Sequence, residues 1–148
     1  MAELYEVLLV DGARRWHTGF LVDDETETDV LLAQGGKVLL FGSRPALEHH
    51  AQERGLPLSD DLPDEVDLEL GGWLAAGTPE PPTAEILELW QLLVDDPVAG
   101  RALAAEDVEE AYDDLVEEAA GWFEQHGPLA RRALGDAVAR LRRASRQV

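Results

Sequence analysis

Residues 4–41 read LYEVLLVDGARRWHTGFLVDDETETDVLLAQGGKVLLF, and this stretch decides the fold class. Four apolar runs are separated by glycine-containing or acidic segments, as is typical of strands joined by turns. The runs predict strands over Leu4–Val10, Trp16–Val22, Thr28–Ala33 and Lys37–Phe41, with an acidic hairpin tip at Asp23–Glu27. Because each connection is short, we expect a four-stranded antiparallel meander.

One helix and a long connection follow the predicted strands. Ser43 or Arg44 caps a helix that carries Pro45 in its first turn and stops at Gly55. Residues 59–82 form an acidic connection rich in proline and glycine. Within it, residues 67–76 fit either a strand or a short helix, and the adjacent glycines 71 and 72 weaken both interpretations.

The last part of the chain has helical periodicity. Thr83 caps a helix that ends before Pro97, an acidic helix covers residues 104–125, and a last helix covers Leu129–Arg146. The Gly127-Pro128 step marks a helix stop, so the last two helices should form an antiparallel helical hairpin. The predicted fold is α+β in one domain of residues 1–148, with sheet and helix over 1–58, the connection over 59–82 and three helices over 83–148.

The acidic helix carries the main functional signal. Nine carboxylates and no Lys or Arg lie between Glu106 and Glu124. One helical face is apolar, with Val108, Tyr112, Leu115, Val116, Ala119, Trp122 and Phe123. The other face carries the candidate partner-binding residues Glu106, Glu110, Asp113, Asp114, Glu117 and Glu118. Charge of one sign adds self-repulsion without helping the helix to fold, which favours a cationic partner.

The net charge of the whole chain also favours a cationic partner. The net charge is −19, but residues 128–148 carry +5 and the other residues −24. Such a protein repels nucleic acid and anionic membranes and attracts basic proteins. Two alternatives stay open: the acidic surface could serve solubility alone, and Arg131, Arg132, Arg140 and Arg143 could reach the acids and partly neutralise them.

Composition also indicates the cellular setting. The chain has no cysteine, which excludes disulfides and thiolate metal sites and fits a cytoplasmic protein. No apolar run is long enough to cross a bilayer, and the N-terminus lacks a signal-peptide pattern. Eleven Arg residues against one Lys favour a bacterial origin with a GC-rich genome.

The search for catalytic chemistry predicts no enzyme, no cofactor and no metal. Ser43 is explained by helix capping, and Gly35-Gly36-Lys37 lacks the other residues of a phosphate-binding loop. His49 and Glu53 have the spacing of two metal ligands on one helix, but no third ligand is indicated. The four tryptophans favour core packing, and Trp73, beside two glycines, becomes a candidate binding anchor if it is exposed.

The hydrophobic spacing over residues 16–96 resembles that of small acidic bacterial immunity proteins, which neutralise secreted toxins. The residues that carry the resemblance are Trp16, Phe20, Leu31-Leu32, Gly36–Phe41, Leu47, Ala51, Gly55-Leu56 and Leu87–Asp96. The resemblance implies an intracellular, non-enzymatic inhibitor that acts by occlusion. The acidic helix and the Arg-rich last helix lie outside the resemblance, and no binding residue transfers from it.

These observations give three hypotheses from different classes. The first is an immunity or antitoxin type of inhibitor that occludes a basic partner protein such as a nuclease toxin. The second is an accessory or structural protein that forms a homo-oligomer, such as a homodimer through the Arg-rich helix, with the acids only solubilising. The third is an enzyme that uses carboxylates and a divalent ion. The first two predict neither nucleic-acid nor membrane binding.

Overall fold

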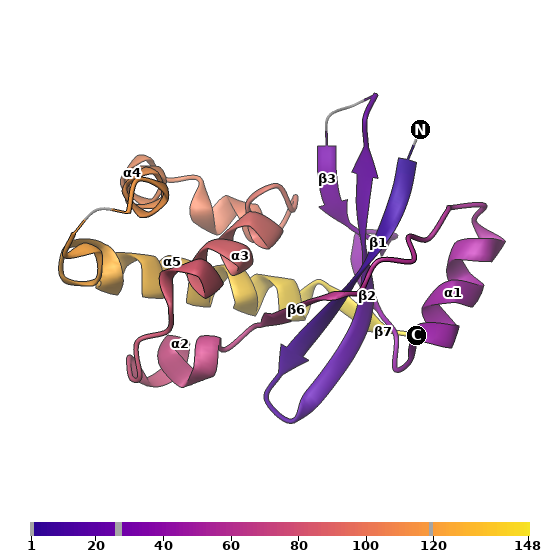
Figure 1. Cartoon of the computed structure of the whole chain (residues 1–148), viewed down its shortest axis with the longest axis horizontal. Helices are drawn as coiled ribbons and strands as arrows, with labels where there is room; N and C mark the ends of the chain where they lie inside the picture. Colours follow the sequence, from indigo (N-terminus) through magenta and orange to yellow (C-terminus); the bar gives the residue numbers. More distant parts are fainter. Residues whose placement is uncertain (1, 26–27, 119) are drawn as a thin grey trace. The chain divides into compact units, whose positions relative to one another are not determined.

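The computed structural model describes residues 2–25, 28–118 and 120–148, and Figure 1 shows its α+β architecture. Within these residues it contains seven strands in two mixed sheets and five α-helices. The chain forms two compact units: Met1–Leu68 together with Ala144–Val148, and Glu69–Arg143. The second unit is thus inserted in the sequence of the first. The sequence predicts a single domain, which requires that the two units fold together. That requirement is not tested by the structure, so the single domain stays a prediction.

The first sheet lies in the first unit and has the strand order β3-β2-β1-β6. β1 (Ala2–Asp11) and β2 (Arg14–Asp23) form the predicted antiparallel hairpin. β3 (Thr28–Leu31) extends it antiparallel to β2, whereas β6 (Asp64–Asp67) pairs parallel with β1. Residues 26 and 27 of the predicted acidic tip lie outside the described residues.

The second sheet shows that the predicted four-stranded meander is wrong. It consists of β4 (Ala33–Gln34), β5 (Lys37–Leu40) and β7 (Ser145–Gln147), with β7 parallel to β5. The chain changes sheets at Leu32, whose N–H donates to the Gly19 carbonyl oxygen at 2.7 Å. The Leu32 carbonyl oxygen accepts from the Leu39 N–H at 3.0 Å. Just after β5, the Phe41 N–H donates to the His17 carbonyl oxygen and the His17 N–H donates to the Phe41 carbonyl oxygen, both at 2.8 Å, so the chain returns to β2 and does not pair with β3.

Helix α1 (Arg44–Glu53) confirms the predicted first helix and completes the first unit. The Ser43 hydroxyl accepts a hydrogen bond from the Ala46 N–H at 3.3 Å, and Gly55 ends the helix with φ = 66°. The helix buries Leu47 and Ala51 against strand residues. The resulting core contains Leu4, Leu32, Leu39, Phe41, Leu47 and Ala51.

The second unit is helical. Its elements are η1 (Leu70–Gly72), α2 (Trp73–Ala76), α3 (Thr83–Val94), η2 (Ala99–Leu103), α4 (Glu106–Val116) and α5 (Trp122–Arg143). The ambiguous segment 67–76 is therefore the end of a strand followed by short helical turns. Helix α5 packs against α2, α3, α4 and η2. None of the helices in the described ranges combines the length and apolar character needed to cross a bilayer.

The predicted helix boundaries around the acidic segment are wrong. The chain turns before Trp122, where Glu118 has φ = 56° and Gly121 has φ = 74°, and α5 then continues through Gly127-Pro128. Pro128 is exposed, so its ring lies on the outer side of a helix whose opposite side is buried along its length. That burial offsets the roughly 3 kcal/mol cost of an internal proline. Figure 1 shows α4 along its axis and α5 lengthwise, so they cross and form no antiparallel hairpin.

Candidate functional site

Helix α4 presents a row of carboxylates to solvent. Glu106, Glu110, Asp113 and Glu117 are all exposed and follow one another at helical spacing on one side of α4 and at its C-terminal cap. We call these four residues the α4 acidic face. The predicted residue Glu118 is also exposed but lies just after the helix. Ala119, predicted for the apolar stripe, lies outside the described residues.

The arginines of α5 do not neutralise this face. Arg131 donates to the carbonyl oxygens of Trp73 and Ala75 at 2.7 and 2.8 Å, so it caps the end of α2. Arg140 pairs with Asp136 one helical turn earlier, at 3.2 Å. Across the parts of the chain that the structure describes, no ion pair joins the α4 acidic face to a basic side chain. The carboxylates of the face therefore remain available to a cation.

Asp114 is the one predicted acid that the fold itself uses. Its carboxylate is half-buried, and Oδ2 lies 2.6 Å from Nε2 of His126 on α5. Nearby, the Trp122 indole N–H donates to the carbonyl oxygen of Ala111 at 2.8 Å. Both contacts fasten the start of α5 to α4. Asp114 is therefore a structural residue that sits beside the α4 acidic face.

The acidic residues at the two ends of α4 have opposite effects on the stability of the helix. Its N-cap residue, Ala105, offers no side-chain acceptor, and acids in the first turn stabilise the positive end of the helix dipole. At the other end the dipole is negative, and the last turn has no basic residue. Asp113 and Glu117 there oppose the dipole at a cost of about 0.3–1 kcal/mol each. Helix formation therefore explains the acids at the start of α4 but not those at its end.

The seventh predicted site residue, Trp73, is buried. Only 3% of its surface is exposed, and its ring meets Phe123 edge-on, with ring centres 6.0 Å apart. The condition that would have made Trp73 a binding anchor is therefore not met. Its role is core packing, as for the buried Trp90 and Trp122.

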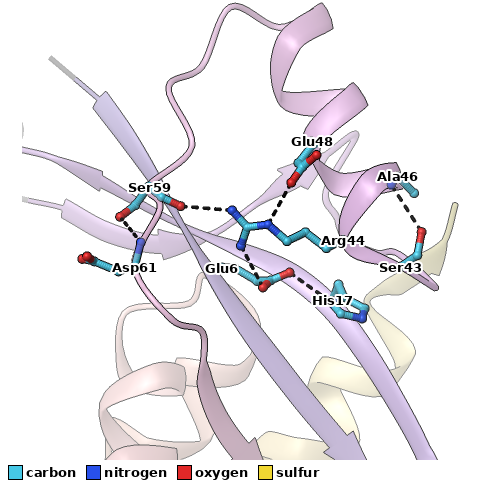
Figure 2. Close-up of polar contacts among 8 residues, drawn as sticks. All are labelled: Glu6, His17, Ser43, Arg44, Ala46, Glu48, Ser59 and Asp61. Atoms are coloured by element: carbon cyan, nitrogen blue, oxygen red, sulfur yellow. Dashed lines mark hydrogen bonds and ion pairs between the residues drawn. The ribbon is translucent and has the colours of Figure 1, made fainter.

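A second cluster of charges lies in the first unit (Figure 2). The Glu6 carboxylate, 2% exposed, contacts Nδ1 of His17 at 2.9 Å and Nη1 of Arg44 at 3.0 Å. Arg44 also donates to the Glu48 carboxylate at 2.9 Å and to the Ser59 carbonyl oxygen at 3.3 Å. Hydrogen bonds to Glu48 and then Glu6 raise the pKa of Arg44. Every charge in this cluster has a partner, so the cluster joins β1, β2 and α1.

Sequence reasoning missed this cluster, although one signal was present. Glu6 is the only charged residue within the strand segment Leu4–Val10, where a carboxylate with no partner would be costly to bury. The location of its partners depends on the fold, because Arg44 is distant in sequence. The exposed loop residue Leu62 was also missed.

His49 and Glu53, the two residues with metal-ligand spacing, both lie on α1. His49 Nε2 and Glu53 Oε1 lie 3.1 Å apart as the spacing predicts, but both side chains are exposed and pair with each other. In the described ranges, no group of three or more His, Cys, Asp or Glu side chains is arranged to hold a metal ion.

Comparison with known proteins identifies the fold and nothing more specific. No family model matches the sequence, and no curated protein matches it. Among solved structures, the chain is similar to the C-terminal domain of SatS, whose crystal structure was determined in complex with bromine. The TM-score is 0.63 at 15% identity, covering 98% of this chain and 94% of that one. At this identity the similarity shows a shared fold alone.

Proposed function

We propose that this protein is a non-enzymatic binding protein that occludes a basic partner protein, in the manner of an immunity protein that neutralises a toxin. The α4 acidic face is the contact surface. A nuclease toxin fits this role because its active groove is cationic to receive phosphates, and a row of carboxylates presents the same charge.

The observation that carries the proposal is the uncompensated charge at the C-terminal end of α4. Asp113 and Glu117 oppose the helix dipole and have no basic partner among the described residues, so they lower the stability of the helix. A cationic partner would remove that repulsion on binding. It would also be steered toward the face, which raises the association rate at low salt.

The test compares two variants with equal net charge. The face variant carries Glu106→Gln, Glu110→Gln, Asp113→Asn and Glu117→Gln. The control variant carries Glu80→Gln, Glu85→Gln, Glu88→Gln and Asp95→Asn, which are exposed acids elsewhere in the same unit. Each protein is immobilised and exposed to native lysate at low and high salt, and retained basic proteins are purified and assayed for nuclease activity with and without the wild-type chain.

The proposal requires that wild type and the control variant retain a basic protein that the face variant releases. The wild-type chain should also inhibit that protein's activity. Equal retention by the two variants would show that only net charge matters, and the α4 acidic face would then have no specific role.

A further inference from the structure

Leu62 is displayed on the surface of the first unit. The residue is 92% exposed, whereas Val148, another large apolar residue on the surface of that unit, is 63% exposed. A single exposed apolar residue is common in proteins. Leu62 is unusual because of how firmly its loop is held and which residues surround it.

The loop that carries Leu62 is fixed at both ends to β1. Before the loop, the Ser59 N–H donates to the Leu4 carbonyl oxygen at 2.8 Å, and after it Asp64 pairs with Val7 in the parallel ladder of β6. Arg44 binds the Ser59 carbonyl oxygen, and the Asp61 N–H donates to the Ser59 hydroxyl at 3.2 Å (Figure 2). The short segment 60–63 therefore projects from a fixed base, which lowers the entropy lost on binding.

Apart from Pro63, the nearest neighbours of Leu62 in sequence are acidic, and they do not cover it. Asp60, Asp61, Asp64 and Glu65 are all exposed. Glu65 pairs with Arg15 at 3.3 Å, and both side chains of that pair are more than half exposed. The loop thus offers one aliphatic side chain in an acidic stretch of sequence, a pattern complementary to an apolar surface flanked by Lys or Arg.

We propose that Leu62 is a binding anchor that packs against an apolar surface flanked by basic residues on a partner protein. The proposal rests on the proposed function for the positive charge of that partner, and it adds a specific apolar contact on the first unit. Complementary charge orients the partner, and burial of the leucine supplies affinity that salt does not screen.

The test uses the full chain and two defined probes. One is a helical peptide of Lys and Leu with its leucines on one face, and the other has Ser in place of every Leu. Binding is measured by fluorescence anisotropy for wild type, Leu62→Ser, Leu62→Met and Val148→Ser. Val148 is the matched control, because it is an exposed aliphatic residue of the same unit whose nearest neighbours in sequence include Arg146 and no Asp or Glu.

We expect Leu62→Ser to weaken binding of the Lys/Leu peptide about tenfold, corresponding to burial of much of one leucine side chain. Leu62→Met should bind as wild type does, and the Lys/Ser peptide should bind all four proteins equally. The proposal that Leu62 is an anchor is excluded by any of three results: Leu62→Ser leaves the affinity for the Lys/Leu peptide unchanged, lowers the affinity for both peptides equally, or lowers it no more than Val148→Ser does. The face variant distinguishes the two proposals, because it should bind both peptides more weakly than wild type does. If it binds them as tightly as wild type, that result counts against the α4 acidic face and not against Leu62.

Discussion

Asp114 Oδ2 lies 2.6 Å from His126 Nε2 and links α4 to α5 within a segment otherwise free of bases. The contact gives two neighbouring acids different roles. Asp114 is half-buried and paired, whereas Asp113 is exposed, with no basic partner in the described ranges.

This difference predicts opposite effects on stability. Asp114→Ala leaves His126 without its partner and should lower the free energy of unfolding by about 1–2 kcal/mol. Asp113→Ala removes a charge that opposes the helix dipole and should raise the free energy of unfolding by about 0.3 kcal/mol. Urea denaturation of both variants at neutral pH measures the difference. Equal loss in both variants would mean that the contact with His126 does not contribute.

The buried carboxylate of Glu6 should be essential to the first unit. Glu6→Ala removes the acceptor for both His17 and Arg44 and should cost about 2–3 kcal/mol. Glu48→Ala removes the exposed partner of the same Arg44 and should cost less than about 1 kcal/mol. Thermal unfolding followed by circular dichroism compares them, and similar melting temperatures would contradict the assigned role of Glu6.

Two glycines of the second unit should respond oppositely to alanine. A Cβ at Gly100 would lie 2.3 Å from the Val94 carbonyl oxygen, a backbone atom that cannot move aside locally. We expect Gly100→Ala to cost about 2 kcal/mol or more. At Gly135 in α5, no described atom beyond the adjacent helix backbone lies within 4 Å of the added Cβ, so Gly135→Ala should stabilise by about 0.5–1 kcal/mol. Chemical denaturation of the pair tests the packing of η2 against α3.

His50 should make the first unit sensitive to acid. Its Nε2 is buried with no hydrogen-bond partner in the described structure, and its ring lies 5.3 Å from that of Phe41. Burial, followed by the charge of Arg54, lowers the pKa of His50 below its ordinary value of 6.5. Arg146 and His49 act in the same direction, and Glu53 opposes them.

The sign of the effect follows from this lowered pKa. The unfolded chain takes up the proton first, so the stability due to neutral His50 is fully present above pH 6.5 and is lost as the pH falls below it. His50→Leu should therefore lose less stability than wild type between pH 7.5 and pH 5. An identical pH dependence in the two proteins would exclude His50 as the source.

Local sequence patterns predicted the parts of the fold that depend on neighbouring residues. The β1–β2 hairpin and α1 with its Ser43 cap follow from residues close in sequence. Strands β6 and β7 could not be predicted, because Asp64–Asp67 is acidic and Ser145–Gln147 is polar. They are strands because distant residues pair with them: β1 with β6, and β5 with β7.

The candidate site shows the same limit. The spacing of Glu106, Glu110 and Asp113 predicted one exposed face, because helical periodicity is local. The pairing of Asp114 depends on where α5 begins, and the chain turns at Glu118 and Gly121 instead of at Gly127-Pro128. No sequence pattern indicates that Glu118 adopts a left-handed backbone conformation. Gly127-Pro128 strongly indicates a helix end, but the packing of α5 keeps the helix continuous there.

The most direct test is the affinity of the captured basic partner for wild type, the face variant and the control variant, measured by calorimetry at low and physiological salt. If α4 forms the contact, the face variant binds at least about tenfold more weakly at low salt and has a flatter salt dependence, while the control variant stays close to wild type. Equal weakening in the two variants would contradict a binding role for α4 and reduce its acids to a source of net charge.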